Sequence, residues 1–519
     1  MKQLFKTYYP LFPIIALCGF YVYQATGFVL HDFANYYFGG YFFSEGHFTS
    51  DLYFPDIFNR EIATLGYTSV FTSFAPNTPF LTLLFYPFHF VNPFTAKLVF
   101  NLISCVLFLY SLSRIFRFYT IKPVYLIVLP VLFFIPIKNN LLFGQLYFLL
   151  FFLLAEGWLA YERKRFTPMA LFWSLAILIK IFPAILILFL LFRKNYKAAL
   201  LLIGFCFGFT LLSVLTNGIE IWIFFLRDVF PKASNGEIAT AFVDNYQSVH
   251  MFLKRLFIFD PIENQNPVFD SPLLFKTLLT AFKLSLLFIG YCITKNDQNK
   301  LFAFSYWIIA AILVSPYGST YTFILLLFPF LYLVKQPGSL PAKTMVLLLL
   351  FISCNIPISI LITKTFPVSY LRMAFVIAFS VWYLSSIRNS IPWKKSIWIP
   401  VFSVLIGISG FYLQTKDNST PILPKDSPIL IYDYTVSDDQ LRYFFRDENG
   451  EHSATIPLPE VKQSEALIQN NQIFYNNKQQ TFGSDHKRKA IVLDRQTLLY
   501  LSDYDRGIGF YTLRKSTIH

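Results

Sequence analysis

An acidic residue stands where the first apolar run of the chain ends. The run covers 11–30, and Asp32 is the first residue after it that carries a full charge. A carboxylate at such a boundary can take a proton from a hydroxyl as a general base, or it can cap the helix that follows. Position alone leaves both interpretations open. Asp51 is an alternative acid in the same polar stretch, and its simpler interpretation is a solvated loop residue.

Aromatic residues surround this acid. Tyr36 and Tyr37 follow Asp32 closely, and because aromatic faces suit both sugar rings and lipid tails, we predict that these two tyrosines contact a sugar or a lipid. The rings of 33–43 recur at nearly every turn of a possible helix that would lie in the membrane interface. A second short helix is expected over 56–65.

Two polar side chains interrupt apolar runs further along the chain. Lys180 lies inside the apolar stretch 175–191, where an unpaired ammonium is costly. We therefore expect Lys180 to face a cavity or an anion such as a phosphate, or else to snorkel or bind a carbonyl group. Pro183 breaks the helix there. Gln145 begins another apolar run and is either a polar residue at a helix start or a hydrogen-bonding group in the cavity.

A polar cluster lies between two later apolar runs. Its simplest interpretation is a hydrated loop; a functional one is recognition of a leaving phosphate by Arg255 or Lys254, because guanidinium groups bind phosphate through two hydrogen bonds. His250 is a third candidate for this phosphate. Asn245 and Gln247 are candidate contacts for a sugar or a lipid.

The composition is that of a membrane protein. Hydrophobic residues make up 55% of the chain, charged residues 14%, and Phe alone contributes 63 residues, which excludes an ordinary soluble enzyme. The apolar runs are continuous rather than alternating, so they predict helices, and about 11 to 13 spans follow if each needs about 20 residues. The candidate spans are 11–30, 97–113, 123–137, 144–161, 198–216, 273–293, 301–314, 319–334, 343–363, 369–387 and 397–413, with 166–193 as a further, interrupted run.

The positive charge of +14 predicts the orientation of these helices. Short basic loops favour the cytoplasmic side, and this interpretation outweighs nucleic-acid binding. The loops are 114–122, 162–165, 193–197, 295–300, 335–343 and 388–395. All can be cytoplasmic if 76–91 does not fully cross and if 166–193 returns as a hairpin of broken helices. The N-terminus is then cytoplasmic, and the loops 31–75 and 217–272 lie outside.

The chain divides into a membrane part, 1–413, and a soluble tail, 414–519, which we expect outside the membrane. The tail holds 13 Lys/Arg and 14 Asp/Glu, so the excess positive charge lies in the membrane part. Apolar stretches at 429–434, 472–475, 490–493 and 498–501 predict strands and a small β-rich domain. The five cysteines have no metal-binding or disulfide spacing, and nucleotide motifs are absent, so no cofactor and no metal are predicted.

An ordered set of motifs resembles the family-87 glycosyltransferases of the GT-C superfamily. In the first outer loop these are Asp32-Phe33-x-x-Tyr36-Tyr37, Leu52-Tyr53 and Phe74-x-Pro76-x-x-Pro79. Further along they are Gly144-Gln145, Lys180-x-x-Pro183, Asn245-x-Gln247-Ser248 and Ser315-Pro316. The resemblance covers roughly residues 10–390. The chain departs from the family pattern at Ala75, at Leu146-Tyr147 and at Thr320-Tyr321, which bears on the donor sugar more than on the reaction.

The resemblance implies an integral membrane transferase in a bacterial plasma (inner) membrane. It implies transfer of a sugar, typically mannose or another hexose or pentose, from a polyprenyl-phosphate donor to a hydroxyl of a lipid-linked or glycan acceptor on the extracytoplasmic face. The family's catalytic base corresponds to Asp32, and the transfer inverts the anomeric carbon. Lys180, Arg255, Lys254, His250 and Gln145 are then the candidates for the donor and its phosphate, and Tyr321 joins the sugar or lipid contacts. A divalent metal is compatible with this chemistry but not required.

Two other functions remain as alternatives. A polytopic transporter or a flippase for lipid-linked glycans would explain the helices and Lys180, but it predicts inverted repeats with paired broken helices, and no second copy is evident in the sequence. A polymerase or ligase of lipid-linked glycans shares the lipid-phosphate substrate, but it would concentrate Arg and His in a late outer loop.

Overall fold

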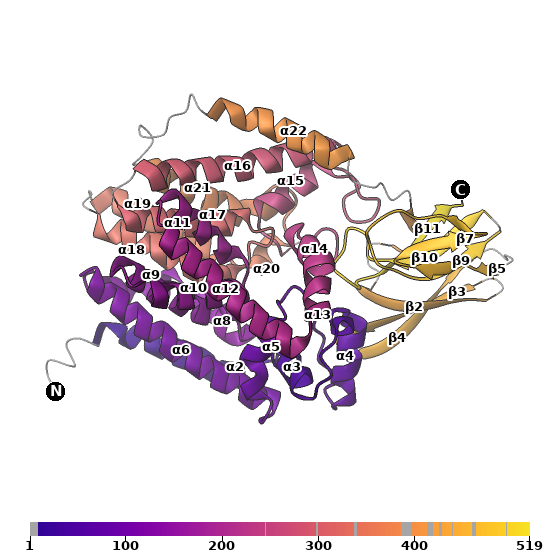
Figure 1. The fold of residues 1–519 in the computed structure, drawn as a ribbon, viewed down its shortest axis with the longest axis horizontal. Coiled ribbons are helices and arrows are strands. Elements are labelled where there is room, and N and C mark those ends of the chain that lie inside the picture. Colours follow the sequence, from indigo (N-terminus) through magenta and orange to yellow (C-terminus); the bar gives the residue numbers. More distant parts are fainter. Residues whose placement is uncertain are drawn as a thin grey trace.

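The computed structural model consists of a helical part and a strand-rich C-terminal part (Figure 1). It describes residues 9–243, 245–296, 299–336, 340–385, 396–412, 419–424, 428–437, 440–458, 463–494 and 496–518. The helices of the first 217 residues are α2 (Phe12–Thr26), α3 (Phe33–Ser44), α4 (Pro55–Thr64), α5 (Phe80–Phe85), α6 (Pro93–Phe118), α7 (Val124–Leu132), α8 (Phe134–Phe143), α9 (Tyr147–Glu162), α10 (Phe166–Ile179), α11 (Ile185–Phe192) and α12 (Tyr196–Asn217). The later helices are α13 (Ile219–Phe224), α14 (Phe230–Ser234), α15 (Val249–Phe257), α16 (Pro272–Asn296), α17 (Lys300–Val314), α18 (Leu327–Lys335), α19 (Leu340–Asn355), α20 (Ile358–Leu361), α21 (Leu371–Ser385) and α22 (Trp398–Tyr412).

The long apolar helices are fewer than the predicted spans. By length and composition, 4 helices among the described residues can cross a membrane, or 5 if α7 and α8, bent by 65°, form one span. Six further apolar helices have 10–17 residues, so a count of 11 to 13 spans requires these shorter helices to cross as well. An apolar run therefore does not predict one unbroken helix here. The prediction of a mostly helical, polytopic membrane protein is confirmed.

Two interrupted segments behave as predicted. In 76–91 the helix α5 has only 6 residues, about 9 Å, which is too short to cross a bilayer core. Helices α10 and α11 form a hairpin, since the rings of Trp173 and Phe189 lie 6.5 Å apart. After the hairpin, Asn195 Nδ2 donates a hydrogen bond of 2.6 Å to the hydroxyl of Tyr161, which precedes α10. The chain thus returns to the end from which it entered.

The segment 31–75, which is predicted to be the first outer loop, contains the two predicted helices, α3 and α4. The rings of α3 lie differently from the prediction, because Phe33, Tyr36, Phe38 and Phe42 are all buried in the protein rather than spread in the membrane interface. They pack against the rings of Phe85 and other residues of the helical part. The first outer loop is therefore part of the core.

The C-terminal part is β-rich, as predicted. Its strands are β1 (Thr420–Pro421), β2 (Leu430–Ser437), β3 (Gln440–Asp447), β4 (Gly450–Pro457), β5 (Gln463–Glu465), β6 (Leu467–Gln469), β7 (Gln472–Tyr475), β8 (Lys478–Gln479), β9 (Lys487–Leu493), β10 (Thr497–Ser502) and β11 (Thr512–Thr517). They form antiparallel sheets in the orders β1-β11-β10-β9-β5, β2-β3-β4 and β6-β7-β8. All four predicted strands are confirmed. The predicted boundary at 413/414 lies outside the described residues.

The C-terminal domain is docked on the outer loops beside α4, α13 and α14 (Figure 1). Ion pairs cross the boundary: Lys232 Nζ lies 3.1 Å from Asp503, and Arg506 lies 3.2 Å from Glu263. The other cross-boundary ion pairs are Lys254 with Asp505 at 2.9 Å and Arg488 with Asp56 at 2.6 Å. In addition, His486 Nε2 lies 3.5 Å from a carboxylate oxygen of Asp228. These contacts fix the domain against both large outer loops.

Gly507 packs closely against the segment 230–239 of the helical part. A Cβ built on Gly507 would lie 2.1 Å from the backbone oxygen of Ile238, closer than any real contact. We expect Gly507→Ala to weaken docking by about 1–3 kcal/mol, because a backbone carbonyl cannot move aside like a side chain. The measurement is the melting temperature of the purified protein together with the rate of trypsin cleavage in 463–494. Gly208→Ala, whose Cβ would meet nothing within 4 Å, is the control, and equal behaviour of the two variants would contradict this account.

Candidate active site

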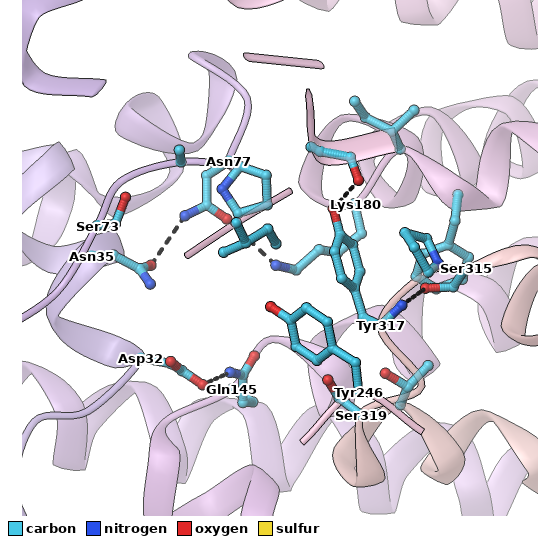
Figure 2. Close-up of a pocket in the computed structure, with 18 of the residues that line it drawn as sticks. Asp32, Asn35, Ser73, Asn77, Gln145, Lys180, Tyr246, Ser315, Tyr317 and Ser319 are labelled. Carbon is cyan, nitrogen blue, oxygen red and sulfur yellow. Dashed lines mark hydrogen bonds between the residues drawn. The ribbon is translucent and has the colours of Figure 1, made fainter. Parts of the chain in front are cut away.

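A cavity of about 710 Å³ opens where the outer loops meet the helices. Its walls come from the first outer loop, the break between α10 and α11, the second outer loop, the end of α17, and the C-terminal domain. Its polar lining residues are His31, Asp32, Asn35, Tyr36, Thr72, Ser73, Asn77, Thr78, Gln145, Tyr147, Lys180, Ser234, Tyr246, Lys283, Ser315, Tyr317, Ser319, Tyr321 and Thr322. Figure 2 shows the part of this lining around Asp32 and Lys180.

Asp32 stands at the N-terminal cap position of α3, but its side chain forms no cap hydrogen bond. One carboxylate oxygen instead accepts a hydrogen bond from Gln145 Nε2. The other lies 3.4 Å from His31 Nδ1, and the Asp32 side chain is 33% exposed. The carboxylate is therefore held in place while it remains open to a molecule in the cavity.

Gln145 is oriented by the turn that ends α8. Gly144 has a left-handed conformation with φ 65°, and a Cβ there would lie 2.6 Å from Cβ of Phe33. This turn brings the buried Gln145 beside α3, where the hydroxyl of Tyr36 donates to Gln145 Oε1 at 3.0 Å. Because Oε1 is an acceptor, the Nε2 group must be the side that donates to Asp32.

Lys180 occupies the break between α10 and α11. Its Nζ lies 3.4 Å from Asn77 Oδ1 and 5.5 Å from the centre of the Tyr36 ring. Asn77 Nδ2 donates to Asn35 Oδ1 at 3.1 Å and to the carbonyl of Phe74 at 2.8 Å, which turns the Asn77 oxygen toward the lysine. No carboxylate of the described ranges lies within 4.0 Å of this ammonium. In Figure 2 it projects into the space that Asp32 also faces.

Tyr246 and Tyr317 lie across the cavity from Asp32 and Asn35 (Figure 2), and Tyr147 and Tyr321 also line the cavity. The rings of Tyr246 and Tyr317 are 5.2 Å apart, and those of Tyr147 and Tyr321 are 5.1 Å apart. Gly318, with φ 57°, lets the turn after α17 approach the backbone of the second outer loop. The Ser315–Pro316 turn is thus packed into the site.

The structure places five of the predicted site residues on the cavity: Asp32, Tyr36, Gln145, Lys180 and Tyr321. The others are not among its lining residues: Tyr37, Asp51, Asn245, Gln247, His250, Lys254 and Arg255. Asp51 and Asn245 are exposed away from it.

The residues outside the cavity have structural contacts instead. The hydroxyl of Tyr37 donates to the carbonyl of Val91 at 2.8 Å, and Gln247 Nε2 donates to the carbonyl of Ser369 at 2.9 Å. Lys254 binds Asp505 of the C-terminal domain, and Arg255 Nε donates to the hydroxyl of Tyr370 at 3.1 Å. Burial lowers the pKa of His250 to about 3, with Lys254 and Lys283 adding to the shift, so His250 is uncharged at neutral pH.

The sequence reasoning missed Lys283 and Asn77. Lys283 lies on α16 and lines the cavity. It carries the same signal as Lys180, since it stands inside the apolar run 273–293, where a charge is costly. Asn77 lies between the two prolines of the Phe74 motif, but a single loop asparagine has no recognisable signature.

A comparison with protein-family models assigns residues 74–316 to glycosyltransferase family 87. The resemblance to a GT-C type glycosyltransferase is thereby confirmed, and the family indicates a membrane glycosyltransferase. The matched region contains Asn77, Gln145, Lys180 and Lys283, whereas Asp32 precedes it and the C-terminal domain follows it. Searches of curated proteins and of solved structures find no match.

A substitution at Lys180 separates function from stability. We expect Lys180→Met to leave the melting temperature unchanged or raised, because it removes an ammonium without a carboxylate partner from apolar surroundings. Sugar transfer should fall roughly 100-fold if this cation stabilises charge in the reaction. Both are measured on purified protein in detergent.

Lys97→Met is the control for this prediction. Lys97 is also buried, but its Nζ donates to the carbonyl of Val29 at 2.7 Å, so its loss should lower the melting temperature. A Lys180→Met protein that melts lower than wild type and keeps its activity would show a purely structural lysine.

Proposed function

Because residues 74–316 indicate a membrane glycosyltransferase, we propose that the protein moves a sugar from a polyprenyl-phosphate donor to an acceptor hydroxyl on the extracytoplasmic face, inverting the anomeric carbon. The sugar is mannose or another hexose or pentose, and the acceptor is a lipid-linked molecule or a glycan. The observation that carries the proposal is the Asp32 carboxylate, which Gln145 orients into a cavity that two lysines also line.

Asp32 acts as the general base in this proposal. As the acceptor oxygen attacks the anomeric carbon, its proton passes to the carboxylate oxygen that Gln145 does not bind. The bond between the anomeric carbon and the phosphate oxygen breaks on the opposite side, and polyprenyl phosphate leaves with the electron pair. Gln145 keeps the carboxylate aimed throughout, because its own orientation is set by Tyr36.

The charges of the cavity favour a donor with a single phosphate. Among the described lining residues, the side chains with a full charge are Asp32, Lys180 and Lys283, which leaves one positive charge in excess. A polyprenyl-phosphate sugar is a diester with one negative charge, so the two balance. The lysines can offset the charge that grows on the leaving phosphate, and the reaction therefore requires no divalent metal.

The placement of the cavity supports the proposed orientation. Helix α12 has 22 residues, about 33 Å, and its first turn lies beside the basic loops 162–165 and 193–197. Its last residue, Asn217, is bound by Thr82 and leads into α13 near the C-terminal domain. The basic loops and the C-terminal domain thus lie at opposite ends of the helical part. We propose a cytoplasmic N-terminus and an extracytoplasmic tail in a bacterial plasma membrane, and this arrangement supports the orientation.

Substitution of the base is the sharpest single test of the mechanism. We expect Asp32→Asn to lower the rate of transfer by ~10²–10⁴-fold, because the amide cannot accept the proton, while the protein inserts and melts normally. Asp51→Asn, in the same loop but exposed outside the cavity, should keep the wild-type rate. Full activity of Asp32→Asn protein would remove Asp32 as the base.

The enzyme's preference between donors with one and two phosphates tests the proposed balance between the cavity charges and the donor. The purified protein is incubated with mannose linked to undecaprenyl phosphate or to undecaprenyl diphosphate, and release of the lipid phosphate is measured. We expect the monophosphate donor to be used at least about tenfold more efficiently, because the second phosphate adds charge that the lysines do not offset. A preference for the diphosphate would contradict the proposal, and solute flux without turnover of either donor would favour a transporter.

A further inference from the structure

The C-terminal domain contributes side chains to the cavity. Phe510 and Ile429 both line it, next to Ile238 and Ala239 of the second outer loop. Resting on the proposed sugar transfer, we propose that this domain is the acceptor-binding wall of the active site. In this arrangement the part of the Phe510 ring that reaches the cavity contacts the apolar face of a neutral sugar ring of the acceptor and helps to determine which acceptor is used.

The segment that carries Phe510 is fixed rather than mobile. The carboxylate of Asp503, fully buried, accepts hydrogen bonds from the backbone N–H groups of His486 at 2.8 Å and Gly509 at 2.9 Å. It also pairs with Lys232, whose Nζ donates to the carbonyl groups of Asp503 and Arg506. Phe510 therefore directly follows a segment that buried hydrogen bonds hold in place, which is what a specificity wall requires.

The position of this wall selects the acceptor rather than the donor. Donor lipid arrives from the membrane, and the side of the cavity nearest the helices is lined by apolar residues at the α10–α11 break, namely Ile179, Ile181, Phe182 and Ile185. The proposed phosphate contacts also belong to the helical part, since Lys180 lies at the α10–α11 break and Lys283 lies on α16. The C-terminal domain and the segment 230–239 close the opposite, outer side, from which an acceptor extends toward water.

The chemistry of the outer wall indicates the class of acceptor. Its described lining residues are uncharged: Phe230, Ala233, Ser234, Ile238, Ala239, Ile429 and Phe510. An uncharged wall with one serine hydroxyl suits a sugar ring, which has an apolar face and hydroxyl groups at its edge. Phe510 is 5% exposed, so only a small part of its ring reaches the cavity, and Ile429 beside it on this wall is 44% exposed. An acidic acceptor would find no cation on this wall.

The test compares acceptors and variants in the full-length protein. The probes are undecaprenyl-phosphate mannose as donor, and octyl glucoside or octyl glucuronide, which differ in charge, as acceptors. We expect wild type to prefer octyl glucoside. Phe510→Leu keeps most of the volume but removes the aromatic face, and it should raise KM for octyl glucoside about tenfold. Its kcat and its KM for the donor should stay close to wild type, while its melting temperature falls slightly because Phe510 is buried and Leu is smaller.

Phe482→Leu is the matched control, because Phe482 belongs to the same domain but is exposed and does not line the cavity. Equal acceptor KM values for the Phe510→Leu, Phe482→Leu and wild-type proteins would contradict the proposal that the C-terminal domain binds the acceptor. A preference for octyl glucuronide would contradict the proposal that the acceptor sugar is uncharged. A wild-type protein that releases no undecaprenyl phosphate with either acceptor would instead overturn the proposed function on which the wall rests.

Discussion

Backbone that leaves the helical conformation beside lipid must find hydrogen-bond partners inside the protein, and the site depends on this constraint. Three interruptions surround the cavity: the left-handed turn at Gly144, the break at Lys180 and the turn after Ser315. The carbonyl of Leu178, which the break frees, accepts a hydrogen bond of 2.5 Å from Thr78 of the first outer loop. Each interruption thus ties an outer loop to the helices and directs a polar side chain into the cavity.

The same interruptions explain why the polar groups are oriented rather than merely present. Gly144 brings Gln145 between Tyr36 and Asp32, so one amide accepts a hydrogen bond from the tyrosine hydroxyl and donates one to the carboxylate. Asn77 repeats the arrangement on the other side, where its amide nitrogen is bound and its oxygen faces Lys180. A neutral amide therefore separates each charged group from the apolar core, which keeps both charges available to a ligand.

Parts of the structure could be predicted from sequence where a residue is energetically unfavourable in its surroundings or where an apolar stretch is short and bounded by polar residues. Lys180 could be found because an ammonium in an apolar run needs a reason to be there, and the four predicted strands could be found from their apolar stretches. Lys254, Arg255 and His250 were assigned to phosphate from residue type alone. Their partners, such as Asp505 and Tyr370, come from distant parts of the chain. No local pattern indicates such pairings, nor that Phe510 reaches the cavity.

The most direct measurement is a structure of the Asp32→Asn protein with undecaprenyl-phosphate mannose bound. The account predicts that the phosphate lies within hydrogen-bond distance of Lys180 Nζ. It also predicts that the anomeric carbon faces position 32, with space for a hydroxyl about 3–3.5 Å away. A phosphate bound instead beside Lys254 and Arg255, or a sugar whose anomeric carbon faces away from position 32, would contradict it.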